Sequence, residues 1–73
     1  MFEKSQIRED MIVVDADGER VGIIDLVEEK RFRLKRAECK DRLPHYLPMA
    51  SVAHVERDIA TLEDDVQIPV GVR

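Results

Sequence analysis

Cysteine is scarce in this chain, since Cys39 is the single cysteine among 73 residues. One cysteine cannot form an internal disulfide, which excludes the disulfide-stapled class. No apolar run approaches the roughly 20 residues that a membrane-spanning helix needs, and residues 1–10 lack the apolar core of a signal peptide. We therefore expect a soluble, cytoplasmic protein without a membrane span.

The length predicts one domain with one small core. A chain of this size buries only about 60% of the surface that it exposes when unfolded. Its stability is expected to be modest unless it pairs with a copy of itself or with a partner. Hydrophobic residues make up 44% and charged residues 38%, and the charges are spread along the chain, which indicates a folded domain rather than disorder.

Residues 31–38 carry the clearest strand signal. Arg31, Arg33 and Lys35 alternate with Phe32 and Leu34, and a period of two is typical of a strand with one face buried. Similar apolar or β-branched segments, bounded by turn residues, predict further strands at 11–16, 19–29, 45–47, 53–56 and 58–63.

The segment between the two middle strands contains Pro48, which cannot donate to a sheet, so we expect an irregular or 3₁₀ turn around Met49–Val52. Helical signal is confined to a single turn at 5–11, capped by Ser5. The whole pattern predicts an all-β domain: a small, closed β-barrel of five or six mainly antiparallel strands, with little or no helix.

The stretch "VVDADGERVG" (13–22) resembles the start of a calcium loop. If Gly18 is the sixth position of an EF-hand, however, the first and twelfth ligands fall on Val13 and Ile24, which are apolar. Asp-Gly between two apolar runs is instead a strong hairpin signal. We expect Asp15 to accept backbone N–H groups and Gly18 to adopt a positive φ.

The order of several short motifs resembles the PRC-barrel group, the small β-barrel of the reaction-centre H subunit and of a ribosome-maturation factor. These motifs are "IREDM" (7–11), "VDADG" (14–18), the Val21–Gly22 pair and "YLPM" (46–49). The chain is most similar to a stand-alone bacterial subfamily of uncharacterised proteins. Asp10 stands where that subfamily has glycine, and aspartate tolerates the left-handed conformation that such a turn needs. The resemblance implies no catalytic residues.

The core is expected to contain apolar residues from every predicted strand, namely Ile12, Val14, Val21, Ile24, Leu26, Phe32, Leu34, Leu47, Val52, Val55 and Leu62. In "VGIIDLV" (21–27) apolar residues fall on both faces. Either Gly22 marks a bulge that shifts the strand's phase, or the second face is covered by the tail or by another subunit.

We divide the chain into a domain at 1–63 and a C-terminal tail at 64–73. Val66, Ile68, Val70 and Val72 alternate in the tail. The tail is therefore either a loose terminus or an arm that docks on a neighbouring copy.

The net charge is −4, but residues 30–42 hold seven basic and two acidic side chains. Arg31, Arg33 and Lys35 on one strand face could grip phosphates of RNA or DNA. The preceding strand carries Asp25, Glu28 and Glu29, which an antiparallel hairpin would place beside these cations. Few aromatic residues and overall acidity also oppose nucleic-acid binding, so we expect local charge compensation or a protein contact.

The sequence gives little support for a metal site or a catalytic site. Cys39, His45 and His54 lack the paired spacing of zinc sites, although the cations around Cys39 would favour its thiolate. The carboxylates Asp15, Asp17, Glu19 and Asp25 would need a concave pocket to act as an acid–base pair. No phosphate-loop or nucleophile-elbow motif occurs. We expect no metal, no cofactor and no enzymatic activity.

The sequence thus predicts a non-catalytic protein-interaction or adaptor module. It is expected to self-associate, as a dimer, with the interaction surface formed by Arg31, Arg33, Lys35, Val66, Ile68 and Val70. The alternative is a ribosome- or RNA-associated factor that binds through the basic strand at 30–36.

Overall fold

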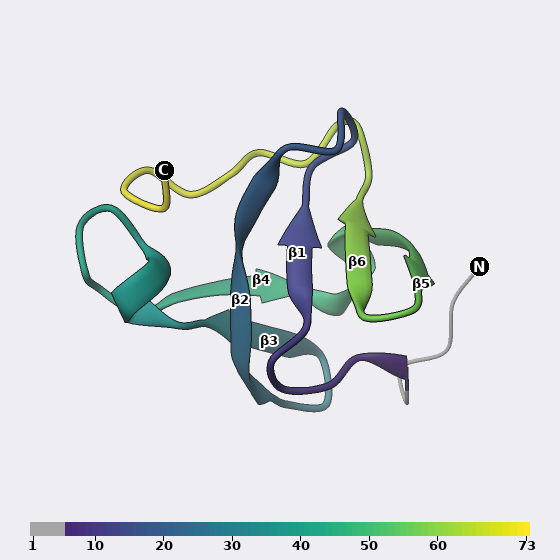
Figure 1. Cartoon of the computed structure of the whole chain (residues 1–73), viewed down its shortest axis with the longest axis horizontal. Coiled ribbons are helices and arrows are strands. Elements are labelled where there is room, and N and C mark those ends of the chain that lie inside the picture. Colours follow the sequence, from purple (N-terminus) through teal and green to yellow (C-terminus); the bar gives the residue numbers. More distant parts are fainter. Residues whose placement is uncertain (1–5) are drawn as a thin grey trace.

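The computed structural model describes residues 6–73 and is all-β, as predicted (Figure 1). Short 3₁₀ turns are the only helical elements that it assigns within these residues. The elements are β1 (Ile12–Val14), β2 (Arg20–Val27), β3 (Arg31–Leu34), η2 (Arg36–Glu38), β4 (His45–Pro48), η3 (Met49–Ser51), β5 (Val52–Glu56) and β6 (Ile59–Leu62). The predicted 3₁₀ turn after Pro48 is therefore confirmed.

The six strands form one curled sheet in the order β4-β3-β2-β1-β6-β5. All neighbours are antiparallel except β1 and β6, which are parallel. The two edge strands, β4 and β5, are consecutive in sequence, but η3 turns the chain between them, so they are not paired in residues 6–73. The barrel is therefore a half-barrel, whereas the sequence predicted a closed one.

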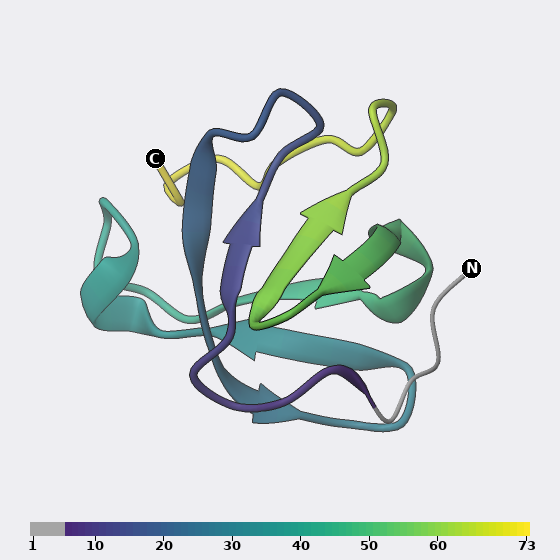
Figure 2. The ribbon, with the colours of Figure 1, turned by 45° about the vertical axis from the view of Figure 1, so that its right-hand side comes forward.

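Strand β2 joins the two halves of the sheet. Its first half pairs with β1 and its second half with β3, and each pairing skips one residue, Val21 against β1 and Asp25 against β3. Such bulges bend and twist a strand, which lets β2 pass from the upright layer of β1 and β6 to the crossing layer of β3 and β4 (Figure 2). The bulge predicted at Gly22 thus falls on its neighbour Val21.

The turn chemistry expected between β1 and β2 is confirmed. The Asp15 carboxylate accepts the backbone N–H groups of Asp17 and Glu19 at 3.0 and 2.9 Å. Gly18 has φ +86°, and Asp10 takes the left-handed conformation in the preceding turn with φ +71°. Residues 15–19 are a hairpin bend.

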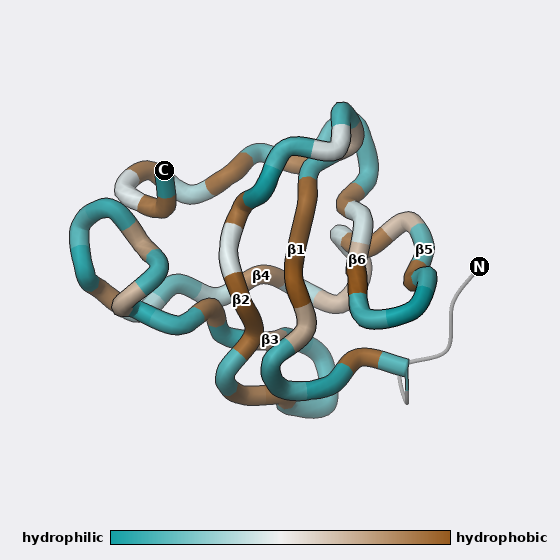
Figure 3. The backbone as a smooth tube through the Cα atoms, in the orientation of Figure 1, coloured by the Kyte–Doolittle hydropathy of each residue, from teal (hydrophilic) through white to brown (hydrophobic). Residues whose placement is uncertain are grey.

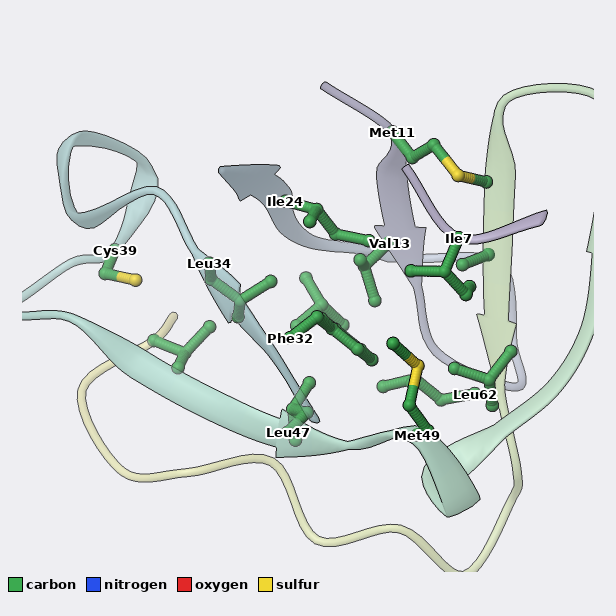
Figure 4. Packing of buried hydrophobic residues seen from close by; sticks show 14 residues of the cluster. Ile7, Met11, Val13, Ile24, Phe32, Leu34, Cys39, Leu47, Met49 and Leu62 are labelled. Carbon is green, nitrogen blue, oxygen red and sulfur yellow. The ribbon is translucent and has the colours of Figure 1, made fainter. Parts of the chain in front are cut away.

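The half-barrel is filled by side chains from all six strands and from the segments around them (Figure 4). Phe32 and Leu34 are fully buried, as the alternation of β3 predicted. The core cluster consists of Ile7, Met11, Val13, Val21, Ile24, Phe32, Leu34, Cys39, Leu47, Met49, Val52, Ala60, Leu62 and Val72.

The predicted inward face of β1 was wrong by one residue. Val13 is fully buried, whereas Ile12 and Val14 are only partly buried and lie outside the core cluster, as does Leu26. In the sheet Val13 lies opposite Gly22 and Ala60, which are also buried, so the pairing with β2 and β6 sets the phase of β1. A shift of one residue moves every side chain of a strand to the other face.

The segment 64–73 forms no strand and folds back on its own barrel. The side chain of Val72 is only 1% exposed, and Val66 and Ile68 pack against the core. The backbone N–H groups of Lys40 and Asp41 donate to the carbonyls of Val72 and Gly71 at 3.0 and 2.9 Å. The tail thus completes the core, and of its four alternating apolar residues Val70 is the exposed one, at 96%.

Replacing Gly71 by alanine tests this docking. Gly71 has φ +101°, and a Cβ there would lie 2.0 Å from Oδ2 of Asp41. Gly18 also has a positive φ but has open space around it. We expect Gly18→Ala to lower the free energy of unfolding by about 1–2 kcal/mol through backbone strain alone, and Gly71→Ala to lower it further. Urea titrations measure both, and equal losses would contradict a docked tail.

Candidate interaction surfaces

Arg31 and Arg33 on β3 and Lys35 directly after it face solvent, but each is paired. Arg31 contacts Glu28 at 2.5 Å and Arg33 contacts Asp25 at 2.8 Å. Hydrogen bonds to these carboxylates raise the pKa of both guanidinium groups. The predicted compensation by the preceding strand and turn is therefore confirmed for these two residues.

Lys35 pairs with Asp10 at 2.9 Å, a partner from the turn before β1 that the sequence did not indicate. The guanidinium of Arg31 also lies over the ring of Tyr46 on β4, 3.9 Å from its centroid. This cation–π contact already occupies one face of the aromatic ring. The face formed by Arg31, Arg33 and Lys35 is thus a balanced, self-paired surface rather than an open basic patch.

A second surface is the outer face of the upright layer. Register pairs Ile12 with Ile23 on one side and with Ile59 on the other, so three isoleucines lie across three neighbouring strands. The three isoleucines point outward, because Val13 and Ala60, the next residues along β1 and β6, are fully buried on the inner face of the sheet. We call Ile23, Ile12 and Ile59 the isoleucine row. Figure 3 shows the adjacent hydrophobic stretches of β2, β1 and β6 that include it.

The isoleucine row accounts for the apolar residues on both faces of "VGIIDLV". Within residues 6–73 the tail does not cover it, because the apolar tail residues pack on the core or, like Val70, face solvent. Ile59 is 41% exposed. Strands that are packed against other groups on both faces carry apolar residues on both faces.

Charged side chains flank one end of the isoleucine row. Glu56 lies opposite Ile59 in the β5–β6 pairing, and Arg57 follows in the turn with φ +57°. Neither has an ion-pair partner in the described part of the chain. Asp58, in the same turn, forms an ion pair at 2.5 Å with Arg8 from the segment before β1. The surface therefore carries an apolar strip with one free charge of each sign beside it.

Cys39 does not have the environment of a reactive thiol. It is buried, and its Sγ donates to the backbone carbonyl of Lys35 at 3.4 Å. Desolvation by burial, followed by the negative charge of Asp41, raises its thiol pKa. The expectation that nearby cations favour the thiolate was wrong, because burial outweighs them.

The two histidines and Cys39 are not brought together as ligands. His45 contacts Asp41 at 2.9 Å, while His54 lies exposed on β5. Across residues 6–73, no group of three or more histidine, cysteine or acidic side chains is placed to hold a metal ion. In the same range, no helix has the length and apolarity to cross a membrane.

Of the four acidic residues considered for a catalytic pair, Asp15 and Asp25 have structural partners. Asp15 accepts two backbone N–H groups and contacts Arg73 at 2.9 Å, which lowers its pKa. Asp25 is the partner of Arg33. Asp17 and Glu19 lie exposed in the same hairpin turn as Asp15.

A family described as "Uncharacterized protein conserved in bacteria (DUF2171)" matches residues 7–67. The chain belongs to this family. The match extends past the expected boundary at residue 63 and covers every strand of the half-barrel. Comparison with curated proteins and with solved structures found no match. This match confirms the expectation that the chain belongs to a bacterial family of uncharacterised proteins.

Asp41 organises the loop that receives the tail. Its carboxylate accepts the backbone N–H of Leu43 at 3.0 Å and contacts Nε2 of His45 at 2.9 Å. The hydrogen bond from Leu43, followed by the one from His45, lowers the pKa of Asp41. Together with Asp15, which holds Arg73, it fastens the last residues of the DUF2171 chain from two sides.

These lowered pKa values predict an acid-dependent loss of stability. A carboxylate with a depressed folded-state pKa stabilises the fold above its unfolded pKa, about 4, and this contribution is lost as pH falls through the folded value. We expect the free energy of unfolding to fall below pH 4, and Asp41→Asn to be less stable at pH 7 but less sensitive to acid. Denaturant titrations at several pH values measure both.

Asp64→Asn is the matched control, because Asp64 is exposed and without an ion-pair partner in the described residues. It should keep the slope of stability against pH that the unmodified chain shows. If Asp41→Asn shows that same slope, Asp41 does not contribute to the acid-dependent loss of stability.

Proposed function

We propose that this DUF2171 protein is a non-catalytic, cytoplasmic interaction module that associates with a second copy of itself through the isoleucine row. The observation that carries the proposal is the alignment of Ile23, Ile12 and Ile59 across β2, β1 and β6 on the outward face. Covering such a strip removes apolar surface from water, which stabilises the complex by about 25 cal/mol for each Å² buried. A small domain with a modest core gains much from such burial.

A second copy fits this surface better than an arbitrary partner. In a twofold dimer the same patch faces itself, so each residue meets a symmetry-related neighbour. The unpaired Glu56 and Arg57 beside the isoleucine row carry opposite charges, which the twofold arrangement can pair between copies. Such complementary charges fix the register of an interface.

We also propose that the half-barrel is related to the PRC-barrel group. Support comes from the order of the turn at Ile7–Met11, the hairpin at 14–18 and the "YLPM" segment in a chain that folds into a small curled sheet. Fold-level kinship carries no activity by itself, so it adds to the interaction proposal only a scaffold without catalytic residues.

The tail's share in self-association is narrower than the sequence suggested. Val66 and Ile68 lie against the core of their own chain, and Val72 is buried in it. Val70 is the tail residue that we propose as an additional contact. Cutting the chain after Glu63 would also remove Val72 from the core, so a point change at Val70 is the cleaner test.

Sedimentation of Ile59→Lys tests the interface. We expect the unmodified chain to form a dimer and Ile59→Lys to be a monomer, because a charge in the isoleucine row cannot be buried without a partner. Leu43→Lys is the control, since Leu43 is an exposed apolar residue on a loop away from the row. Val70→Lys measures the tail's share.

Unfolding measurements on each variant separate lost association from lost folding. A folded Ile59→Lys chain that still sediments with the unmodified protein would contradict the interface. A monomer in every variant, including the unmodified chain at high concentration, would overturn self-association.

RNA association through 30–36 is the second candidate, favoured by the unpaired Lys30 and Arg36 at the two ends of this segment. Two or three phosphate contacts predict that RNA affinity falls roughly tenfold between about 50 and 200 mM salt. Lys30→Gln with Arg36→Gln should abolish the binding. Fluorescence anisotropy with a labelled RNA measures both, and salt-independent or absent binding would dismiss this candidate.

A further inference from the structure

A groove lies between the loop after β3 and the end of the tail. Its volume is about 530 Å³, and its lining includes Arg20, Glu38, Cys39, Lys40, Arg42 and Arg73. Figure 1 shows the loop and the end of the tail side by side, next to the start of β2. The groove lining and the isoleucine row share no residue, although Gly22 of the lining directly precedes Ile23 of the row in β2.

Positive charge dominates the lining. Arg20 pairs with Glu38 at 2.6 Å, and Arg73 pairs with Asp15 at 2.9 Å. Lys40 and Arg42 are exposed and have no ion-pair partner among the described residues. Lys30, Arg36 and Arg57 are also unpaired among the described residues, but Lys40 and Arg42 are the two unpaired cations that line one concavity.

Hydrogen bonds fix the backbone that carries Lys40 and Arg42. Arg42 has φ +62°, a conformation uncommon for residues other than glycine, and its N–H donates to the carbonyl of Cys39 at 3.0 Å. The N–H of Lys40 donates to the carbonyl of Val72, which fixes the loop to the tail. The Asp15 pair orients Arg73 from the other side. The groove is therefore preformed when the tail is docked.

We propose that this groove binds the phosphate groups of a small anionic ligand, with Lys40 and Arg42 as the primary contacts and Arg20 and Arg73 in support. Guanidinium groups present planar donors that match phosphate oxygens, and lysine supplies a compact charge. The volume lies within the usual range for small-ligand sites. This binding site is independent of the proposed self-association.

A phosphate fits the groove better than a carboxylate from another copy. The exposed acidic turn Glu63–Asp65 could offer carboxylates, but each of these has only two oxygens in one plane. Cations that approach from β2, the loop and the tail surround a ligand from several directions, and a tetrahedral phosphate can accept from all of them. Cys39 lies buried at the floor and takes no part.

Pyrophosphate titration of the ¹⁵N-labelled full chain, at constant ionic strength, tests the site. We expect saturable shifts of the amide signals of Gly22, residues 40–42 and Val72, which line or border the groove. Lys40→Gln with Arg42→Gln should raise the dissociation constant at least about tenfold, because charge-assisted hydrogen bonds are lost. Inorganic phosphate and succinate serve as comparison probes.

Arg8→Gln with Arg31→Gln is the matched control. It removes the same charge from two exposed cations whose ion pairs lie outside the groove lining. This control should bind pyrophosphate like the unmodified chain. The proposal is overturned if no saturable shift occurs, if the control loses affinity equally, or if succinate binds as tightly as pyrophosphate. Dimerisation that depends on Lys40 and Arg42 would instead assign the groove to a second copy.

Discussion

The structure depends on the three residues of β1, which are hydrogen-bonded on both sides. The N–H of Ile24 on β2 donates to the carbonyl of Met11 at 3.0 Å, and the N–H of Ile12 donates to the carbonyl of Asp58, before β6, also at 3.0 Å. The parallel pairing of β1 with β6 joins the beginning of the chain to its end. Pairings of such high sequence separation carry a loop-closure cost, which the buried Val13 and Ala60 offset.

The other features follow from this pairing. Because Val13 faces inward, Ile12 faces outward with Ile23 and Ile59, and this alignment creates the isoleucine row. Because β6 ends beside the first hairpin, the tail runs back over the barrel and places Val72 in the core. The docked tail in turn forms one wall of the cationic groove. The proposed interaction surface and the proposed ligand site therefore share one structural origin.

Local signals predicted much of this fold. Asp15 and Gly18 specify their turn through their own side-chain and backbone chemistry, and the alternation of β3 places Phe32 inward unambiguously. The phase of β1 could not be predicted, because "MIVV" is apolar at every position and its inward face is set by the register with β2 and with β6, which is distant in sequence. The same holds for the burial of Val72, whose neighbours lie far away in sequence.

The ion pairs at the candidate surfaces also depend partly on residues close in sequence and partly on residues brought together by the fold. Pairing of Arg33 with Asp25 followed from a predicted hairpin, whereas Asp10 reaches Lys35 only through the folded sheet. The most direct test of the account is the scalar coupling across hydrogen bonds in the labelled protein. We predict a coupling between the amide nitrogen of Ile12 and the carbonyl carbon of Asp58; its absence, together with rapid exchange of the Ile12 amide proton, would contradict the central place of β1.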